Sequence, residues 1–364
     1  MTKREQQILD ILRNEPMIAQ QDLATKLGLS RSAVAGHIMN LTKKGFIQGK
    51  GYIISPDQYA VVIGGANMDL CGRSTSNLIQ GDSNPGELIS SAGGVARNIA
   101  DNLSRLGSSV QFIGVMGDDV WGEQLKNACR EAGVNVDNCL TIAGATSSSY
   151  LSIHDSDGEM QLALNDMKLI DNLSSDQLRQ REGVINRAST IVLDANISPD
   201  ALDYLFDIHS DTAIFVDPVS SVKAPKLLPF LDRVHTLKPN LIEAELLSGV
   251  TMQQPSDLEK ITDILHNKGI KQLLISLGSK GAYSSNHQGA NFISPAQTQV
   301  NNVTGAGDAL MAGLAHGHLK QWQWSDTVEF ALGAARLALT ADNTINSTMS
   351  EKAVKRLLKE TITC

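Results

Sequence analysis

The first 57 residues carry apolar side chains at helical spacing, in three stretches that short turn signals separate. Pro16 ends the first stretch, Gly28 allows a tight turn after the second, and Ser30 can cap the third, which ends at Gly45. The positions that define the three helices are Ile8, Leu9, Ile11 and Leu12, then Leu23, Ala24 and Leu27, then Val34, His37, Ile38 and Leu41. Residues 46–54 follow as a small hairpin around 49–51. Two short helices joined by a glycine-containing turn predict a helix-turn-helix.

From residue 58 onward the pattern changes to short apolar runs that alternate with amphipathic helical segments. The apolar runs occupy residues 59–65, 110–117, 190–195, 213–218, 234–240 and 272–278. Strands that alternate with helices predict a mostly parallel sheet covered by helices on both faces. Ser55, Pro56 and Asp57 mark a linker. The pattern therefore predicts two domains, residues 1–57 and residues 58–364.

Polar residues follow several of these runs, at the strand ends where open α/β sheets bind ligands. They are Asn67, Asp69, Asp118, Asp194, Asp217 and Asn240. Two regions break the alternation: residues 146–164 show near-alternating strands around Asp157-Gly158, which is a hairpin signal, and residues 71–92 are polar and rich in turns. Together they predict a small β lid, at about 71–92 and 145–165, that excludes water from a reaction.

One stretch carries a candidate for chemistry. Residues 302–310 read NVTGAGDAL, so Gly305, Ala306 and Gly307 would present backbone N–H groups at a helix start, which is a ready anion site. The helix dipole should keep the next residue, Asp308, ionised. A carboxylate beside an anion site suits phosphoryl transfer, because one accepts a proton and the other receives the phosphoryl group. The alternative is a capped helix without a catalytic role.

Charge and composition narrow the class of protein. The net charge is −8, with +3 on residues 1–57 and −11 on the rest, which suggests two separate tasks. Four scattered cysteines without a C-x-x-C pair argue against a zinc site or a disulfide framework. No apolar run of about 18 residues predicts a membrane span, and the start lacks a signal-peptide core. We expect a cytoplasmic protein with reduced thiols.

Five motifs in order resemble the ribokinase-like (PfkB) family of sugar and nucleoside kinases. They are IGGANMD, AGGVARNIA, KPNLIEAE, ISLGSKG and NVTGAGDAL, and the resemblance covers roughly residues 59–350. It implies a three-layer sandwich with a mostly parallel central sheet and a small β lid. It also implies phosphorylation of a sugar hydroxyl by ATP with Mg²⁺.

The same resemblance implies roles for individual residues. Asp308 matches the catalytic base, and Gly305, Ala306 and Gly307 match the anion hole. The residues that match the set holding the sugar hydroxyls are Asn67, Asp69, Gly93, Gly94 and Asn98, with Glu159 and Asp166 as weaker substrate candidates. On the nucleotide side, Asn240 and Glu243 match an N-x-x-E motif that organises phosphate and Mg²⁺ through water. Ser276, Gly278 and Gly281 match the loop beside the nucleotide, and Asn343 lies near the adenine.

The substrate and one cofactor remain open at this stage. Stretches such as DSNPGE, TSSSYLSIHDSDGEM and VDPVS are most similar to the bacterial pseudouridine kinases within the family, which implies transfer to a nucleoside 5′-hydroxyl. Inosine, uridine or a free pentose are alternatives. Where many family members carry an aspartate that helps bind a monovalent cation, this chain has Asn302. An amide is a poorer cation ligand than a carboxylate, which leaves K⁺ activation undecided.

The N-terminal segment resembles the winged helix-turn-helix of bacterial transcription regulators. The third helix would be the recognition helix, with Arg31 near bases or phosphates and Lys43, Lys44 and Lys50 on the DNA backbone. Alternatively, the domain serves only dimerisation or regulation, or the whole chain is a regulator whose kinase-like body senses a nucleoside. We expect a homodimer, because exposed lid strands commonly pair.

Overall fold

The computed structural model describes residues 1–49, 53–54, 56–208 and 212–362. The N-terminal domain contains α1 (Lys3–Asn14), α2 (Gln20–Leu27), α3 (Arg31–Lys43) and an antiparallel pair, β1 (Ile47–Gly49) and β2 (Ile53–Ile54). As predicted, Ser30 caps α3 by accepting the N–H of Ala33, and Gly28 ends α2 in a left-handed conformation. Lys50 and Gly51, expected in the hairpin turn, lie outside the described residues.

The larger domain is built on one eight-stranded sheet. Its strands are β3 (Ala60–Ile63), β6 (Val110–Ile113), β11 (Thr190–Asp194), β12 (Ala213–Asp217), β13 (Thr236–Leu237), β14 (Gln272–Ser276), β15 (Ala282–Asn286) and β16 (Gly289–Ile293). Their order is β16-β15-β14-β13-β12-β11-β3-β6, and all neighbours from β14 to β6 pair in parallel. Only β15 and β16 pair antiparallel, so the prediction of a mostly parallel sheet is confirmed.

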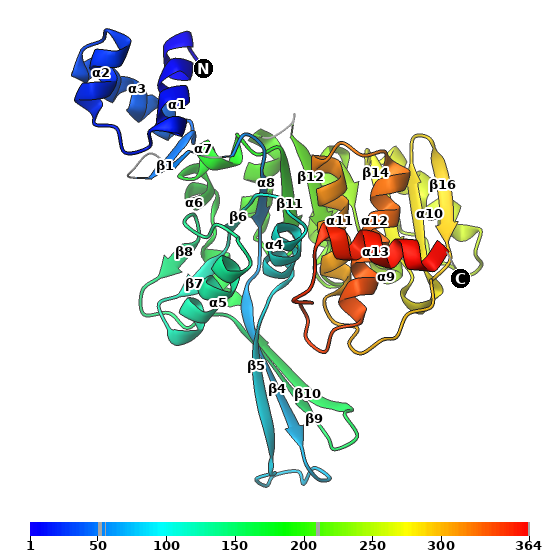
Figure 1. The fold of residues 1–364 in the computed structure, drawn as a ribbon. Helices are drawn as coiled ribbons and strands as arrows, with labels where there is room; N and C mark the ends of the chain where they lie inside the picture. The colour runs from blue at the N-terminus through cyan, green and yellow to red at the C-terminus, as the bar shows by residue number, and fades with distance from the viewer. Residues whose placement is uncertain (50–52, 55, 209–211, 363–364) are drawn as a thin grey trace.

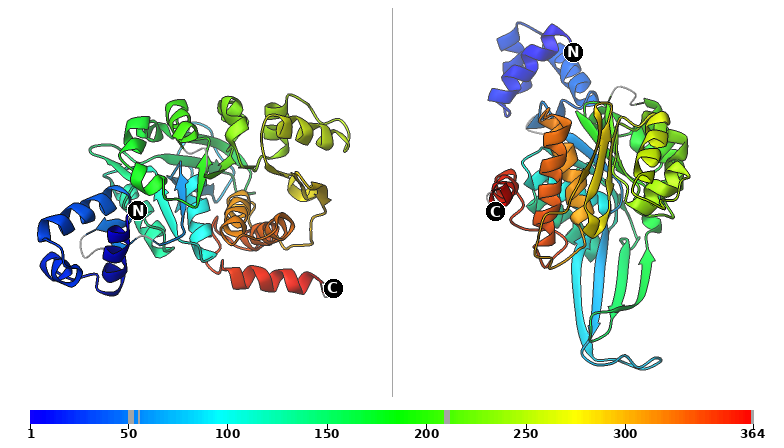
Figure 2. Two further views of the ribbon diagram at one scale, coloured as in Figure 1. Left: turned by 90° about the horizontal axis from the view of Figure 1, so that it is seen from above. Right: turned by 90° about the vertical axis from the view of Figure 1, so that its right-hand side faces the viewer.

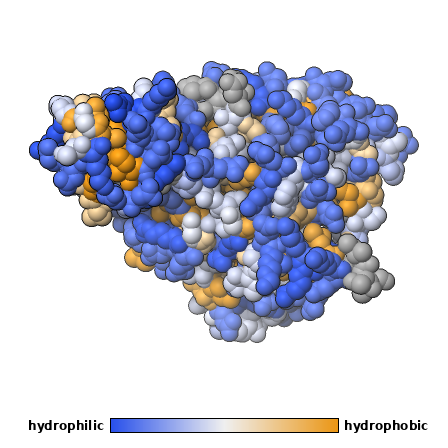
Figure 3. Space-filling view, turned by 45° about the horizontal axis from the view of Figure 1, so that its top comes forward, coloured by the Kyte–Doolittle hydropathy of each residue, from blue (hydrophilic) through white to orange (hydrophobic). Residues whose placement is uncertain are grey.

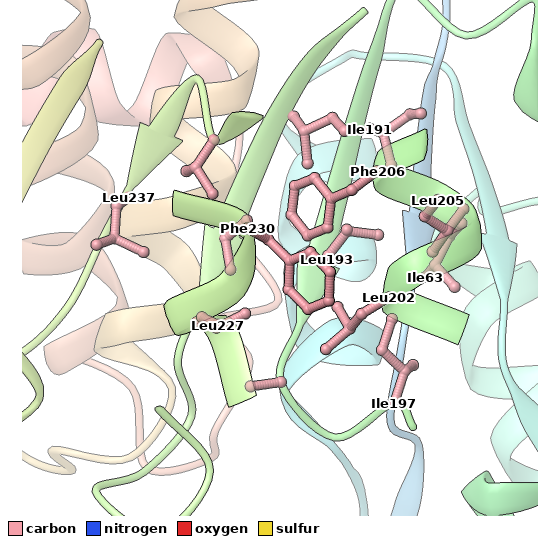
Figure 4. Close-up of a cluster of buried hydrophobic side chains, with 14 of the residues drawn as sticks. Ile63, Ile191, Leu193, Ile197, Leu202, Leu205, Phe206, Leu227, Phe230 and Leu237 are labelled. Carbon is pink, nitrogen blue, oxygen red and sulfur yellow. The ribbon is translucent and has the colours of Figure 1, made fainter. Parts of the chain in front are cut away.

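Helices cover both faces of this sheet, which gives three layers (Figures 1 and 2). One face packs against α8 (Pro199–Ile208), the 3-10 segment η2 (Ala224–Arg233), α9 (Leu241–Ser248) and α10 (Asp257–Asn267). The other face packs against α4 (Val95–Arg105), α5 (Val120–Glu131), α11 (Ala306–Leu319) and α12 (Trp324–Leu339), and α13 (Glu351–Ile362) packs against α12. Figure 4 shows part of the first core, where Phe206 and Phe230 stack with ring centroids 5.0 Å apart. Residues of β3 alternate between the cores, with Val61 in one and Val62 in the other.

A second sheet projects from this body as the lid (Figure 1). Its strands are β4 (Asn67–Ser74), β5 (Gly86–Gly93), β9 (Ser149–His154) and β10 (Met160–Asp166), in the order β10-β9-β4-β5. The lid therefore begins at residue 67 rather than 71. A small parallel pair, β7 (Val115–Gly117) and β8 (Leu140–Ile142), and the short segments η1 (Lys168–Asn172), α6 (Ser175–Arg179) and α7 (Glu182–Ile185) complete this part.

The two domains have separate cores, and they contact each other through Arg187 and through the backbone at Gly45, which lies against Gly183. The core of the N-terminal domain ends at Ile47, and the cores of the larger domain begin at Tyr59. Arg187 donates to the carbonyl oxygen of Gly45 at 2.6 Å, and its guanidinium lies 3.7 Å from the ring centroid of Phe46. We propose the domain boundary at residues 57/58, between these cores.

Cys71, Cys129 and Cys139 are free thiols, and Cys364 lies outside the described residues. Within the described residues, no helix has both the length and the apolar character needed to cross a membrane.

Candidate active site

The start of α11 brings a carboxyl group next to a turn of small residues. Gly305 is the N-cap residue, with φ at 83°, and a Cβ there would lie 2.2 Å from the carbonyl oxygen of Thr344. Only glycine lets that loop lie so close to the helix start. The first helical bond joins the N–H of Ala309 to the carbonyl of Gly305. The N–H groups of residues 306–308 therefore make no intrahelical bond and are available to an anion.

The carboxylate of Asp308 is held by an amide from α4. Asn98 donates from Nδ2 to Oδ2 of Asp308 at 2.8 Å, across 210 positions of sequence. The side-chain oxygen of Asn98 accepts a hydrogen bond from the buried guanidinium of Arg97, which also donates to Asp101 and to the carbonyl of Gly93. Because Arg97 can only donate, it determines which end of the Asn98 amide faces Asp308. Asn98, assigned to sugar hydroxyls from the sequence, thus contacts the candidate base.

The surroundings of Asp308 change its acidity. Burial and the negative charge of Asp217 raise its pKa to about 7, against the hydrogen bond from Asn98 and the positive charges of Lys238 and Arg97. The carboxyl is therefore only partly ionised in the free protein at neutral pH, although the helix dipole favours its charged form. Lost solvation and a second carboxylate outweigh the dipole. A pKa near 7 suits a group that must accept a proton near neutral pH.

A buried ion pair lies beside Asp308, and sequence reasoning missed half of it. Lys238, directly after β13, places Nζ 3.0 Å from Oδ2 of Asp217, the last residue of β12. Burial lowers the pKa of Lys238, but the charge and hydrogen bond of Asp217 outweigh this effect, and the charges of Asp308 and Glu243 also act upward, so the pKa is raised overall. The sequence does contain a signal for this ion pair. An acid and a lysine stand at the ends of successive strand-like runs, and parallel pairing brings such strand ends together.

Asn240 and Glu243 form a capping box at the start of α9. The N–H of Glu243 donates to Oδ1 of Asn240 at 2.9 Å, and the N–H of Asn240 donates to Oε2 of Glu243 at 2.8 Å. The box uses one carboxylate oxygen and leaves the other for a water. That arrangement fits Mg²⁺, which keeps several waters and binds mainly through phosphates. Within the described part of the chain, no three His, Cys, Asp or Glu side chains gather as a direct metal site.

The loop predicted to lie beside the nucleotide is next to this capping box. Ser276, the last residue of β14, forms an isolated parallel bridge with Asn240. Gly278 begins the 3-10 turn η3 (Gly278–Lys280), and Gly281 follows it. The structure thus brings the ISLGSKG and N-x-x-E motifs together at the carboxyl ends of β13 and β14 in the main sheet.

The loop after α12 carries Asn343 and contacts the residue that replaces a cation ligand. Asn343 is exposed and adjoins Thr344, whose carbonyl lies against the α11 start. Asn302 donates from Nδ2 to the carbonyl of Asp342 at 3.0 Å and accepts the N–H of Thr304 on Oδ1 at 2.9 Å. The N–H donor of Asn302 is directed at a carbonyl oxygen that a monovalent cation would need as a ligand, which does not fit a cation at this position.

The residues predicted to hold the sugar lie where β4 and β5 meet the body. Asn67 donates to Oδ1 of Asp69 at 2.6 Å, and burial raises the pKa of Asp69. Gly93 pairs with Asn67, and a Cβ on Gly93 would lie 2.1 Å from Oδ2 of Asp69. Gly94 is the N-cap residue of α4, the helix that carries Asn98. This group and the Asp308 group are therefore joined by α4.

The lid register corrects two substrate candidates. Paired residues of neighbouring strands share a face, and Asp69 lies in one row with Tyr150 and Asn165. Asp166 lies in the adjacent row, on the opposite face. Glu159 lies in the turn at the far end of the β9–β10 hairpin, away from Asp69. Tyr150 and Asn165, which sequence reasoning missed, share the row of Asp69, and we propose them as the lid's substrate residues instead.

In the N-terminal domain, one of the predicted DNA-binding lysines is already paired. Lys44 donates to both carboxylate oxygens of buried Glu5 at 2.9 Å, so it is a poor candidate for a phosphate contact. Arg31 and Lys43 are exposed on α3. Figure 3 shows a hydrophobic patch on this domain within a mostly hydrophilic face of the molecule. Met17 and Met39 are among the exposed apolar side chains of the N-terminal domain.

Two family models match different parts of the chain. Residues 57–352 match the model of the pfkB family of carbohydrate kinases, and residues 1–48 match a winged helix-turn-helix DNA-binding family. An uncharacterized sugar kinase of Escherichia coli, YeiI, is 39% identical over 352 residues, with 96% of this chain and 97% of that protein covered. The pseudouridine kinase of Escherichia coli is 41% identical over 293 residues, with 80% of this chain and 94% of that protein covered.

Solved structures agree with the family match. A sugar kinase structure from Clostridium perfringens superposes with a TM-score of 0.76 and 32% identity, covering 83% of this chain and 96% of that one. Arabidopsis thaliana ribokinase, solved with ribose and ATP, superposes with a TM-score of 0.71 at 23% identity, covering 83% and 99%, which supports the fold. The motifs, the three-layer fold and these matches establish that this chain belongs to the PfkB family of carbohydrate kinases.

Proposed function

We propose that this protein transfers the γ-phosphoryl group of ATP to the 5′-hydroxyl of a nucleoside, with pseudouridine as the first candidate. The observation that carries the proposal is the position of Asp308. It lies at the start of α11 and is bonded to Asn98 of α4, the helix that begins beside the Asn67–Asp69 pair. Lys238 lies within electrostatic reach of both Asp308 and Glu243 of the Asn240–Glu243 box. The 41% identity to a pseudouridine kinase supports a nucleoside as the acceptor. The 39% identity to an uncharacterized sugar kinase leaves other acceptors as alternatives.

In this mechanism Asp308 removes the proton from the acceptor hydroxyl. Its pKa of about 7 means that the ionised form is well populated at slightly alkaline pH. Asn98 then keeps Oδ2 in place, so the other carboxylate oxygen remains for the substrate. The N–H groups of residues 306–308 receive the transferring phosphoryl group, whose charge they stabilise.

Binding residues act on both sides of this centre. Asp69 and Asn67 offer a carboxylate and an amide to the adjacent hydroxyls of a ribose, which both donate and accept. Glu243 would hold Mg²⁺ through water. The metal, bound to the ATP phosphates, would neutralise charge on the leaving group. Because both substrates are found in the cytoplasm, we place the protein there.

The lid would recognise the nucleobase of the acceptor nucleoside. Tyr150 and Asn165 lie in the row of Asp69, so a nucleoside whose ribose binds Asp69 can extend its base along this row. A tyrosine ring offers a stacking surface, and an amide can donate to or accept from a base edge. This combination favours a nucleoside over a free pentose.

An ADP-release assay with pseudouridine, uridine, inosine and ribose tests the substrate directly. We expect pseudouridine to give a kcat/KM at least tenfold above the other three. A preference for ribose would instead assign the protein to the sugar kinases. Tyr150→Ala should reduce kcat/KM for the nucleoside and leave any activity on ribose unchanged.

A second candidate function is a DNA-binding regulator that responds to the nucleoside. It is favoured by the winged helix-turn-helix match and by the Arg187 contact, which joins Gly45 and Phe46 of that domain to the kinase body. A gel shift with DNA from upstream of the gene should show binding that pseudouridine alters. Arg31→Ala should weaken binding, whereas Arg187→Ala should preserve binding and remove the nucleoside effect. Unchanged binding in Arg31→Ala would contradict the α3 assignment.

We also propose that the protein is a homodimer that pairs through its lid. One lid face carries apolar side chains that the body does not cover: Leu70, Leu88, Leu151, Ile153, Leu162 and Leu164. Leu88, Leu162 and Leu164 are 70%, 56% and 60% exposed. Such a face commonly marks a protein contact. Sedimentation should give a dimer for the parent and a monomer for Leu162→Glu, and a monomeric parent would contradict this.

A further inference from the structure

One lysine of the site has no part in the mechanism above. Lys238 is 6% exposed, and its N–H donates to the carbonyl of Val216 at 3.1 Å. The carbonyl of the next residue, Pro239, accepts the N–H of Ser276 at 2.9 Å. The backbone around Lys238 is therefore tied to the strands on both sides, which fixes the direction of its side chain.

The ammonium of Lys238 lies against the first turn of α11. Its Nζ is 3.4 Å from the position that a Cβ on Gly307 would occupy and 3.0 Å from Oδ2 of Asp217. An ammonium has three N–H donors, and the contacts of the described residues use one of them, to Asp217. Two donors thus remain beside the N–H groups that begin α11.

The negative charges of the site favour a cation at this position. The negative charges of Asp217, Asp308 and Glu243 all act on the ammonium of Lys238, and bound phosphates would add further negative charge. The other buried cation, Arg97, already donates to four acceptors. A buried ion pair is rarely more stable than well-packed apolar residues of similar volume, so stability alone does not explain Lys238.

We propose that Lys238, held by Asp217, is a catalytic residue whose ammonium binds the oxygens of the phosphoryl group during transfer, a role that rests on the proposed kinase function. Asp308 takes the proton of the acceptor hydroxyl, whose oxygen forms a bond to the γ-phosphorus. The bond from that phosphorus to the bridging oxygen breaks, and ADP leaves with the electron pair. Lys238 stays protonated throughout and acts where charge develops in the transition state.

Paired variants separate this role from a structural one. Lys238→Met leaves the buried carboxylate of Asp217 without its cation, so misfolding would also explain a loss of activity in this single variant. The double variant Lys238→Met/Asp217→Asn removes both charges together and should melt at or above the parent temperature. Lys226→Met is the matched control, because Lys226 is a partly buried lysine whose amine contacts, among the described residues, are the carbonyls of Ala195 and Ile197.

Two measurements give the answer. For the double variant we expect kcat from ADP release to fall roughly 10²-fold or more, the usual effect of losing one group that stabilises transition-state charge. We also expect roughly 10²-fold weaker binding of MgADP with aluminium fluoride and the nucleoside, a mimic of the transferring state, while the Kd of nucleoside alone changes less than threefold. Lys226→Met should stay within twofold of the parent throughout.

The outcomes distinguish the two levels of the proposal. If the parent is active and the double variant has the same kcat and the same affinity for the aluminium fluoride complex, the proposed role of Lys238 is overturned. The proposed kinase function would not be affected by that result. A parent that releases no ADP with any nucleoside or pentose would overturn the kinase function, and the role of Lys238 with it.

Discussion

Asn98 donates a hydrogen bond to Asp308 at 2.8 Å, while Arg97 occupies the oxygen of the same amide. This arrangement joins α4, which follows the sugar-side glycines, to α11, which begins the phosphoryl site. The base is therefore positioned by the element that also borders the sugar. The order Arg97, Asn98, Asp308 explains why an amide rather than a second carboxylate stands at position 98.

Replacing Asn98 should affect the base directly. Asn98→Ala removes a hydrogen bond to a charged group, and we expect kcat to fall roughly 10- to 100-fold. Asn98→Asp places a second carboxylate beside Asp308, so its activity should recover as the pH rises, because like charges raise the pKa. Steady-state kinetics from pH 6 to 9 measure both effects. Identical pH profiles for the parent and Asn98→Asp would contradict the contact.

The pH dependence of the parent should report Asp308. Since the base must be ionised, kcat/KM should decline as the pH falls through about 7. Asp217→Asn removes a negative neighbour and should move this limb to lower pH, whereas Lys238→Met removes a positive one and should move it to higher pH. Asp171→Asn, at an exposed position, is the control and should leave the limb in place. If Asp217→Asn and Lys238→Met moved the acidic limb of the pH profile in the same direction, this electrostatic account would be ruled out.

Folding stability should also depend on the charge of Asp308. Its pKa is raised in the folded state, so ionisation disfavours folding progressively as the pH rises from the unfolded value through about 7. Asp308→Asn avoids this cost. Its melting temperature should exceed that of the parent at pH 8, with a smaller difference at pH 5. A lower melting temperature at both pH values would contradict the burial of the charge.

Monovalent cations should matter little. Asn302 directs an N–H at the carbonyl of Asp342, so we expect the same kcat, within twofold, in K⁺ and in tetramethylammonium. Asn302→Asp loses that donor and presents a carboxylate instead, and its activity should then increase with K⁺. Activation of the parent by more than tenfold would show that the cation binds despite the amide.

The close approach at Gly305 should be intolerant of a methyl group. Gly305→Ala places a Cβ 2.2 Å from a backbone carbonyl and forces an alanine into positive φ, so both stability and kcat should fall. Gly107→Ala is the matched control, because φ is 98° there and no atom lies within 4 Å of the new Cβ. We expect it to lose some stability and no activity. If Gly305→Ala and Gly107→Ala lost equal activity, backbone strain rather than the close approach at Gly305 would be responsible.

The sequence predicts the layers well and the site only in part. Apolar runs such as 59–65 and 213–218 identify buried strands because both faces of a parallel sheet are covered. The choice of Asn165 over Asp166 depends on pairing between β4 and β9, which are far apart in the chain, and no local pattern contains that register. The pKa of Asp308 likewise depends on Asp217 and on burial, which only the folded arrangement reveals.

The decisive measurement is the turnover of Asp308→Asn with pseudouridine and MgATP, beside a parent that is active on the same pair. Loss of a positioned base predicts a fall in kcat of roughly 10² or more, with a melting temperature no lower than that of the parent at pH 8. Turnover within a few-fold of the parent, in a folded variant, would contradict the central role of this carboxylate.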